Sequence, residues 1–388
     1  MKFNVGFYDF STDAGMNYQL NRLYSTGVMS REELYEIGRK AADFDSWIRL
    51  FSEIAEKAEA AGEYKKAASC FRAAQFYTLS DARDASGASL KKVLYEKCMA
   101  NYDRCYKDIR LMNYVRVPFQ KGYLPVYYAE CEKPKGTIVL HGGYDSFIQE
   151  FLDFLPYFSS MGYDVYFFEG CGQGEVLMRC GIRMTPEWEH CTSALLDYFG
   201  LDDVTLIGVS LGGYLAPRAA VYDQRIRRVV MFDLIYDFYG AITHKMGPWK
   251  AKLFDYMTAH PKSFLWKWLE KKLDENYVTR WLLGQGRIIY ENVSSACDYF
   301  NCIKQYNTRI ISPLLKQDVL VLAGSEDLYT IYYEDQLKAL TNARSVTGRL
   351  FTKEECAGHH CQIGNLQLVL DTITEWIEAK TDGEETGS

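Results

Sequence analysis

Residues 204–214 read VTLIGVSLGGY, and this stretch carries the strongest structural signal in the chain. Apolar and β-branched residues lead into the pattern Gly-x-Ser-x-Gly, and an apolar segment with helical periodicity follows. This order of strand, sharp turn and helix is the setting of a nucleophile elbow, with Ser210 at the tip of the turn. Gly208 and Gly212 suit the turn because side chains two residues before and after the serine would collide. We therefore expect Ser210 to be a catalytic nucleophile.

Further runs of β-branched and aromatic residues lie on both sides of this stretch, with helix-like segments between them. The expected strands are 123–129, 137–141, 164–168, 204–209, 228–233, 318–323 and 346–352. The expected helices are 147–160, 186–199, 211–222 and 362–379. Several of the strands are apolar nearly throughout, which is typical of parallel strands covered on both faces. The alternation predicts an α/β fold with a doubly wound, mostly parallel sheet.

Two other regions have helical periodicity without strands. Near the N-terminus, apolar residues recur three and four apart over 32–59, 65–79 and 90–109. Residues 234–317 form a stretch of 84 residues with helical texture, which is longer than a crossover needs. We therefore predict an N-terminal helical domain and a helical lid inserted into the core. The predicted boundaries are 1–118 for the N-terminal domain, 119–240 and 311–381 for the core, 241–310 for the lid and 382–388 for a flexible tail.

The expected strand at 137–141 ends in His141-Gly142-Gly143-Tyr144. In a sheet of this kind the end of this strand adjoins the nucleophile, and a glycine-rich loop there offers a backbone N–H. The N–H of Gly143 or Tyr144, together with that of Leu211, would form an oxyanion hole. For His141 we favour a structural role, as a histidine that hydrogen-bonds this loop.

A serine nucleophile needs a base, and the base needs an orienting acid. The chain order typical of this elbow is serine, then acid, then histidine. His359 and His360 lie in AGHHCQIGN after the last expected strand, and the pattern alone does not choose between them. Asp327 follows the strand at 318–323 by a short loop, which makes it the preferred acid. The alternatives for the acid are Glu326, Asp233 and Asp237.

Aromatic residues make up 15% of the chain, and the tryptophans concentrate in the expected lid. Residues 241–310 hold four of the seven, namely Trp249, Trp266, Trp268 and Trp281. Because ligand sites favour interfaces between structural parts, we expect a ring-lined pocket beneath the lid. Trp249 and Trp266 are candidate substrate contacts, and Asp233 or Asp237 is a candidate carboxylate near the pocket. A bulky apolar or aromatic small-molecule substrate would fit such a site.

Charge and composition exclude several classes of partner. The net charge is −7, the pI is near 5.6 and no basic stripe appears, so we expect no nucleic acid partner. The N-terminus lacks the features of a signal peptide and no apolar run reaches 18 residues, so we expect a cytoplasmic protein without a membrane partner. The 11 cysteines are scattered without a Cys-x-x-Cys pair. We expect them to be reduced, with no metal and no cofactor, and a homodimer is the candidate assembly.

Four motifs together resemble a known family. They are GVSLGGY at 208–214, FEGCGQGE at 168–175, LAGSEDLY at 322–329 and GHHCQIGN at 358–365. They are similar to motifs of the α/β-hydrolase superfamily, in the branch with a helical N-terminal domain that includes 2,6-dihydroxypseudooxynicotine hydrolase-like and fermentation-respiration-switch esterase-like proteins. The resemblance implies that His360, directly before Cys-Gln, is the base. In the turn at 168–175, Glu169 and Cys171 replace the aspartate and proline of the family phrase.

These observations favour a serine hydrolase that cleaves an ester or amide bond through Ser210, His360 and Asp327. The resemblance also implies an alternative, the hydrolysis of a carbon–carbon bond next to a ketone with the same three residues. An alternative of another class is a non-catalytic scaffold with the hydrolase fold. The loss of a catalytic residue would indicate a scaffold, and all three are present.

Overall fold

The structure is a computed structural model that describes residues 3–107 and 112–385. The chain divides into two units. The first comprises residues up to Met112 together with Gln362–Leu368, and the second comprises Asn113–Cys361 together with the chain from Val369 onward. Among the described residues, no helix combines the length and the apolar character needed to cross a bilayer.

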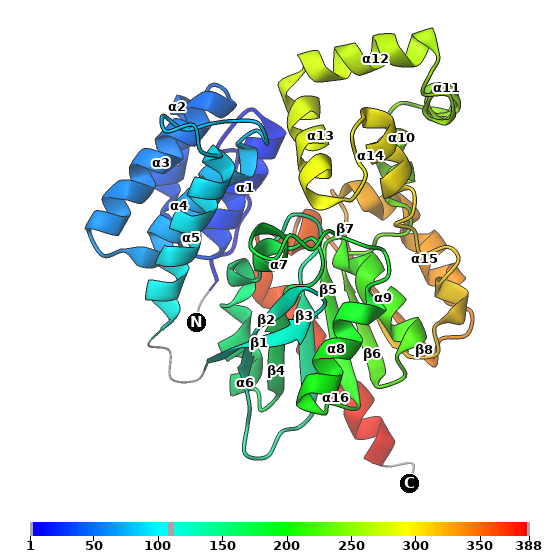
Figure 1. Ribbon diagram of the computed structural model, residues 1–388. Coiled ribbons are helices and arrows are strands. Elements are labelled where there is room, and N and C mark those ends of the chain that lie inside the picture. Colours follow the sequence, from blue (N-terminus) through cyan, green and yellow to red (C-terminus); the bar gives the residue numbers. More distant parts are fainter. Residues whose placement is uncertain (1–2, 108–111, 386–388) are drawn as a thin grey trace. The chain divides into compact units, whose positions relative to one another are not determined.

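Helices make up most of the first unit (Figure 1). They are α1 Ala14–Ser25, α2 Arg31–Lys40, α3 Phe44–Ala60, α4 Tyr64–Tyr77 and α5 Leu90–Tyr106. The single helix expected over 32–59 is instead two helices, because the Asp43 side chain caps α3 by accepting the Ser46 N–H at 2.8 Å. Trp47 is fully buried, and its indole N–H donates to the carbonyl of Ala73 at 2.8 Å, which joins α3 to α4.

The segment Gln362–Leu368 is the part of the first unit that comes from late in the sequence. The carbonyl of Gly364 accepts the N–H of Gly6 at 2.8 Å. In turn, the N–H of Gly364 donates to the hydroxyl of Ser25 at 3.1 Å. The first unit is therefore discontinuous in sequence.

An eight-stranded sheet forms the centre of the second unit, in the order β1-β2-β4-β3-β5-β6-β7-β8. The strands are β1 Asn113–Phe119, β2 Gly122–Ala129, β3 Thr137–His141, β4 Asp164–Phe168, β5 Val204–Val209, β6 Ile226–Phe232, β7 Asp318–Gly324 and β8 Ser345–Phe351. The pairs from β4 through to β8 are parallel, and β2 pairs antiparallel with β1 and β4. Every residue of β5 and β7 is buried, as expected for parallel strands covered on both faces.

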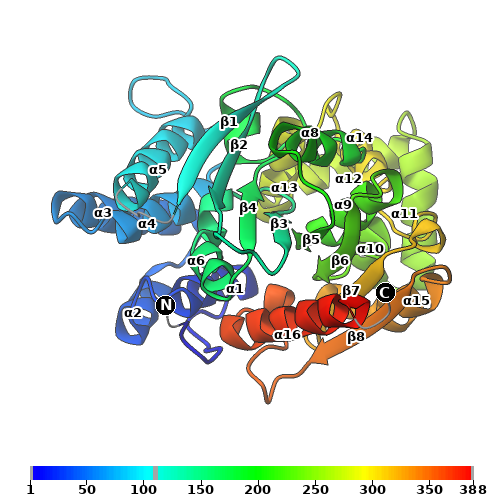
Figure 2. The ribbon, with the colours of Figure 1, turned by 90° about the horizontal axis from the view of Figure 1, so that it is seen from below.

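Helices cover both faces of this sheet, which confirms the predicted doubly wound α/β fold. Figure 2 shows α8 and α9 on one face and α6 and α16 on the other. The helices outside the insert are α6 Phe154–Ser160, α7 Gly174–Met178, α8 Glu189–Phe199, α9 Gly212–Tyr222, α15 Tyr333–Ala339 and α16 Leu366–Glu385. Helix α16 continues to Glu385, and residues 386–388 of the predicted tail lie outside the described residues.

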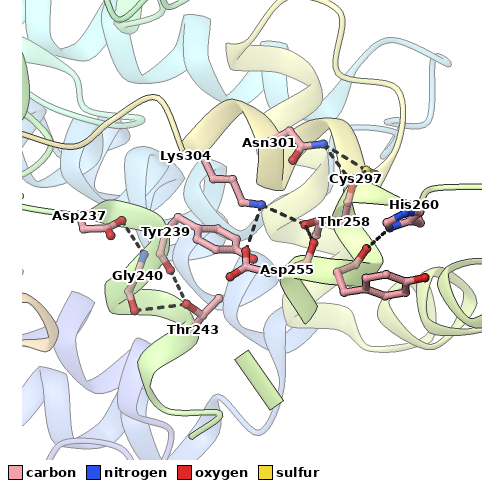
Figure 3. Close-up of polar contacts among 11 residues, drawn as sticks. Asp237, Tyr239, Gly240, Thr243, Asp255, Thr258, His260, Cys297, Asn301 and Lys304 are labelled. Carbon is pink, nitrogen blue, oxygen red and sulfur yellow. Dashed lines mark hydrogen bonds and ion pairs between the residues drawn. The ribbon is translucent and has the colours of Figure 1, made fainter. Parts of the chain in front are cut away.

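The long insert between β6 and β7 folds into a group of helices beyond one end of the sheet (Figure 1). They are α10 Phe238–His244, α11 Pro248–Ala259, α12 Phe264–Glu275, α13 Tyr277–Ile289 and α14 Ala296–Ile303. Phe254 of α11 packs edge-on against Phe300 of α14, with ring centroids 4.8 Å apart. As Figure 3 shows, the Lys304 ammonium holds α11 through Thr258 Oγ1 at 3.0 Å and Asp255 Oδ1 at 3.1 Å. The insert therefore has a small core of its own.

Candidate active site

Ser210 lies at the turn between β5 and α9, with its backbone in the left-handed region at φ +61°. Residues other than glycine seldom adopt this conformation, which costs about 1–3 kcal/mol. The Ser210 N–H donates to the Phe232 carbonyl at 2.6 Å, and the Gly213 N–H donates to the Ser210 carbonyl at 2.8 Å. A side chain at Gly208 is excluded, because a Cβ there would lie 2.1 Å from the carbonyl oxygen of Gly212. The turn thus has the strained form of a nucleophile elbow.

Two contacts connect Ser210 to a histidine and an aspartate. Ser210 Oγ lies 2.8 Å from His360 Nε2, and His360 Nδ1 lies 2.6 Å from Asp327 Oδ2. The three side chains come from the segments that follow β5, β8 and β7. The fold therefore brings together the three residues that the sequence indicated, in the spatial order of nucleophile, base and orienting acid.

The structure also bears on the immediate sequence neighbours of the base and the acid. Of the two adjacent histidines, His359 and His360, it is the ring of His360 that contacts Ser210. Asp327 carries the carboxylate that contacts this ring, whereas the adjacent Glu326 is exposed. The geometry therefore favours one of the two histidines that the pattern left open, and it agrees with the preference for Asp327 over Glu326.

Burial and charge act in opposite directions on His360 and Asp327. Burial lowers the pKa of His360, but the charge of Asp327 and the hydrogen bond to it raise this pKa well above its usual value. Burial raises the pKa of Asp327, but the charge of His360 and the hydrogen bonds that the carboxylate accepts together outweigh burial and bring this pKa below its ordinary value. The pair thus favours an imidazolium beside a carboxylate, the charge distribution that forms when a histidine accepts a serine proton.

Asp233, at the end of β6, lies beside this pair. It is 1% exposed, and its Oδ2 accepts the Cys361 N–H at 2.8 Å. The same oxygen lies 3.6 Å from His360 Nδ1, which is too far for a good hydrogen bond. Burial and the charge of Asp327 raise the pKa of Asp233 well above its ordinary value, and the two carboxyl groups share a hydrogen bond. The raised pKa favours the protonated form of Asp233, which is the form that can donate a hydrogen bond to Asp327.

The loop after β3 packs directly against the elbow. Residue His141 of β3 pairs with Gly208 of β5, which places Gly143 beside Ser210. A Cβ on Gly143 would lie 2.4 Å from the backbone nitrogen of Leu211, so only glycine allows this approach. The backbone N–H groups expected to form an oxyanion hole therefore belong to two segments in contact.

His141 and Gln173 hold the carbonyl groups of this loop. Gln173 Nε2 lies 2.8 Å from the Gly142 oxygen and 3.0 Å from the Gly143 oxygen, and His141 Nδ1 lies 2.8 Å from the Gly142 oxygen. Burial lowers the pKa of His141 to about 4, which favours the neutral ring, and its contact with the loop is the hydrogen bond expected from the sequence. Because C=O and N–H point in opposite directions across a planar trans peptide, these contacts also fix the N–H groups of Gly143 and Tyr144.

Gln173 is a residue that the sequence interpretation missed. It lies in the turn FEGCGQGE, whose sequence resembles a family motif but does not by itself indicate a role for the glutamine. Its amide is buried, and its oxygen accepts the Gly170 N–H at 3.0 Å, so the side chain bridges two loops. A glutamine within a glycine-rich turn is the one signal that could have indicated this role.

Three further residues that the sequence indicated as possible substrate contacts are Asp237, Trp249 and Trp266. Asp237 caps α10 by accepting the Gly240 N–H at 2.7 Å (Figure 3), and it pairs with Arg309 at 2.6 Å. Trp249 is 72% exposed. Trp266 is buried against Phe254, with ring centroids 6.0 Å apart. Substrate contact by these residues remains a prediction.

One group of ligand-type atoms within the described residues coincides with this site. Atoms of Asp233, His360 and Cys361 lie within 4.8 Å of one another. Asp233 already accepts the Cys361 N–H, and His360 Nδ1 faces Asp327. The Asp233 oxygen and the His360 nitrogen are thus already engaged in these contacts, so we interpret the group as part of the hydrogen-bonded array.

Comparison with known proteins identifies relatives named as hydrolases. The chain is 28% identical to the 20-hydroxy-prefusarin hydrolase FUS2 of Gibberella moniliformis, over 94% of this chain and 96% of that protein. It is 27% identical to the hydrolase acrC of Aspergillus aculeatus, over 74% and 76% of the two chains. No family model matches the sequence. These relatives identify the chain as an enzyme and disfavour the non-catalytic scaffold.

A solved structure shows the same fold. The crystal structure of 2,6-dihydroxy-pseudo-oxynicotine hydrolase superposes with a TM-score of 0.60 at 16% sequence identity. The match covers 92% of this chain and 94% of that one, so it includes the helical N-terminal region as well as the sheet. The family resemblance seen in the motifs is thereby supported by the architecture of nearly the whole chain.

Proposed function

We propose that this chain, which belongs to the α/β-hydrolase superfamily and to its branch with a helical N-terminal domain, is a serine hydrolase acting on an ester or amide bond. Hydrolytic activity agrees with the names of its relatives. The observation that carries the finer proposal is the pair of contacts from Ser210 Oγ to His360 Nε2 at 2.8 Å and from His360 Nδ1 to Asp327 Oδ2 at 2.6 Å.

In the proposed first step, Ser210 Oγ attacks the substrate carbonyl while its proton moves to His360 Nε2. Asp327 holds the opposite ring nitrogen in its protonated form and stabilises the positive imidazolium. The negative oxygen of the tetrahedral intermediate accepts hydrogen bonds from the N–H of Leu211 and from that of Gly143 or Tyr144. His360 then donates its proton to the leaving alcohol or amine, and an acyl group remains on Ser210.

Water removes the acyl group by the same chemistry in the second step. His360 accepts a proton from the water molecule, whose oxygen attacks the acyl carbonyl. The intermediate collapses, His360 returns the proton to Ser210 Oγ, and the acid product leaves. Each proton taken up by His360 is released within the same half-reaction, so the enzyme is regenerated without a cofactor.

A second candidate function is hydrolysis of a carbon–carbon bond next to a ketone. The observation that favours it is the second carboxyl group, Asp233, beside the proposed base. Cleavage of such a bond requires a proton on a carbon leaving group, and a protonated acid next to His360 would be a second source of that proton. We rank ester or amide cleavage first, because the Ser210–His360 contact alone is sufficient for it.

A substrate screen tests both candidates. Purified enzyme would be assayed with p-nitrophenyl esters, aminoacyl p-nitroanilides and β-diketones, each with the wild type and with Ser210→Ala. We expect hydrolysis of at least one acyl class and a fall in kcat of about 10⁴-fold or more in the variant. Cleavage of the β-diketones alone would favour the second candidate. Hydrolysis that persists at the wild-type rate in Ser210→Ala would contradict both.

A further inference from the structure

Four tyrosines near the proposed nucleophile share an unusual property. The hydroxyl oxygens of Tyr144, Tyr290, Tyr299 and Tyr306, here called the tyrosine cluster, are fully buried and have no hydrogen-bond partner of good geometry among the described residues. Three of these side chains, those of Tyr290, Tyr299 and Tyr306, are at most 1% exposed as a whole. Buried polar groups in folded proteins are nearly always paired, so four such groups in one place call for an explanation.

The four rings contact one another. The ring centroid of Tyr290 lies 5.9 Å from that of Tyr144, 6.4 Å from that of Tyr299 and 5.6 Å from that of Tyr306. The hydroxyls of Tyr144 and Tyr299 lie close enough for a weak hydrogen bond, as do those of Tyr290 and Tyr306. Such a bond uses one O–H of each pair and leaves the other O–H able to donate to a ligand. The polar ends of the cluster therefore gather in one region.

This region adjoins the proposed catalytic residues within the second unit. Tyr144 supplies one of the candidate oxyanion N–H groups. Tyr306 packs against Tyr214 of α9, the helix that follows Ser210, with ring centroids 5.2 Å apart. The other members come from the lid, since Tyr290 follows α13 and Tyr299 belongs to α14. The cluster thus joins the lid to the surroundings of the nucleophile.

Stability alone does not explain these hydroxyls. An unpaired buried hydroxyl costs about 1–3 kcal/mol, whereas phenylalanine has nearly the same shape and no polar atom. A core selected only for packing would therefore favour phenylalanine at these positions. The hydroxyls are better explained by a ligand that accepts their hydrogen bonds.

The charge state of the cluster indicates which ligand atoms it would take. Burial raises the pKa of all four phenols well above 10, so each remains an O–H donor. The negative charge of Asp145 raises the pKa of Tyr144 and Tyr299 further. The same negative field would repel an anionic ligand. Neutral acceptors, such as ketone, ester and hydroxyl oxygens, suit this environment.

We propose that the tyrosine cluster is a substrate subsite that donates O–H hydrogen bonds to neutral oxygens of the substrate. The substrate would then be an oxygenated acyl compound, with keto or hydroxyl groups in addition to the carbonyl that is cleaved. This inference rests on the proposed serine hydrolase function, because it assigns a specificity to the same site. It refines the expectation of a bulky apolar or aromatic substrate.

The test compares p-nitrophenyl octanoate with its 4-, 5-, 6- and 7-oxo derivatives, which differ only in one ketone oxygen. We expect wild-type kcat/KM for at least one oxo ester to exceed that for octanoate by about tenfold, the effect of one well-formed hydrogen bond. In Tyr299→Phe and in the double variant Tyr290→Phe/Tyr306→Phe, this ratio should fall toward one. The melting temperatures of these variants should equal or exceed that of the wild type, because unpaired hydroxyls are removed.

Tyr239→Phe is the matched control. Its hydroxyl is also buried without a well-placed partner among the described residues, but its ring stacks on Phe254 inside the lid and lies 4.5 Å from the Lys304 ammonium. This variant should keep the wild-type preference for the oxo ester. A loss of preference in Tyr239→Phe equal to that in Tyr299→Phe would mean that the lid as a whole, and not the cluster, determines specificity.

A binding measurement keeps the inference testable apart from turnover. Calorimetric titration of Ser210→Ala with ethyl octanoate and with the ethyl oxo-octanoates should show the same tenfold preference, and Tyr299→Phe in that background should abolish it. Equal affinities for all of these esters would overturn the subsite while leaving the hydrolase proposal intact. Hydrolysis that does not depend on Ser210 would instead overturn the proposed function.

Discussion

The side-chain amide of Gln173 donates to the carbonyl oxygen of Gly142 at 2.8 Å and so ties the turn after β4 to the loop after β3. A second contact, at 3.0 Å, reaches the carbonyl of Gly143. The amide touches no reacting atom in the proposed mechanism, yet it determines where two backbone N–H groups point. Gln173 is therefore a positioning residue for the proposed oxyanion hole.

Replacing Gln173 by leucine should impair the chemical step more than binding. The carbonyls of Gly142 and Gly143 would lose the donor that holds them, so the N–H groups of the oxyanion hole would no longer be held in place. Complete loss of one oxyanion donor lowers kcat by about 10²- to 10³-fold. We expect kcat to fall about 10- to 100-fold in Gln173→Leu with little change in KM, measured by steady-state kinetics. Gln224→Leu, at an exposed glutamine, is the control and should behave as the wild type. A rise in KM without a fall in kcat would contradict the positioning role.

The two carboxyl groups beside His360 should differ sharply in importance. Asp327→Asn removes the charge that orients His360, and we expect kcat to fall about 10³- to 10⁴-fold. Asp233 accepts the Cys361 N–H, and its raised pKa favours the protonated form that can also donate a hydrogen bond; asparagine can do both. We therefore expect less than about a tenfold loss in Asp233→Asn. A larger loss in Asp233→Asn than in Asp327→Asn would assign the acid to Asp233, the alternative left open by the sequence.

The pH dependence of kcat/KM should report the titration of His360. The base must be neutral to accept the serine proton, so activity rises with pH as His360 loses its proton. Because Asp327 raises the pKa of His360, we expect the midpoint of this rise to lie above 6.5. In Asp327→Asn the midpoint should move to lower pH. An unchanged midpoint in this variant would show that Asp327 does not set the charge of the histidine.

Glu169 should make the fold less stable as pH increases. Burial raises the pKa of this carboxyl from 4.5 to about 7, so between these values the folded state binds more protons than the unfolded state. The free energy of unfolding should therefore decrease as pH rises through this interval. We expect the melting temperature to fall more between pH 5 and pH 8 in the wild type than in Glu169→Gln. The exposed Glu132→Gln should match the wild type, and equal slopes in all three proteins would refute the assignment.

The elbow should not tolerate a side chain at Gly208. A Cβ there would lie 2.1 Å from the backbone oxygen of Gly212, and backbone cannot move aside without disturbing Ser210. We expect Gly208→Ala to lower the free energy of unfolding by about 1–3 kcal/mol in urea denaturation and to reduce kcat strongly. In Gly136→Ala, the new Cβ would meet the Tyr163 ring at an ordinary 3.8 Å, so this control should lose little. Full activity in Gly208→Ala would contradict the described turn.

Much of the fold follows from local pattern, and the exceptions have physical causes. The apolar runs that became β3, β4 and β5 match the predicted bounds, because parallel interior strands must be apolar on both faces. Strand β1 was missed because it lies at the edge of the sheet and several of its residues are polar or exposed. Helix α1 was missed because Asn17 and Asn21 lie on its buried face, where their side chains bind the backbone of Phe10 and Tyr8. Apolar periodicity cannot detect a face of this kind.

The candidate site also contains some residues that the sequence indicates and others that only the structure reveals. Ser210 and Asp327 could be proposed from their places in the order of strands, whereas the choice of His360 over His359 depended on the family resemblance. Gln173 and the tyrosine cluster could not be proposed in either way, since their roles depend on side chains meeting across loops and on hydroxyls that lack partners. Such features appear only in three dimensions.

The most direct test of the central claim is to locate a covalent adduct. A fluorophosphonate reacts with an activated serine, and peptide mass spectrometry of the labelled protein identifies the modified residue. We expect a single adduct on the peptide that contains Ser210, none in Ser210→Ala, and wild-type labelling in Ser52→Ala, whose hydroxyl bonds to the Ile48 carbonyl. Folded wild-type protein that remains unlabelled, or an adduct that persists in Ser210→Ala, would contradict the assignment of Ser210 as the nucleophile.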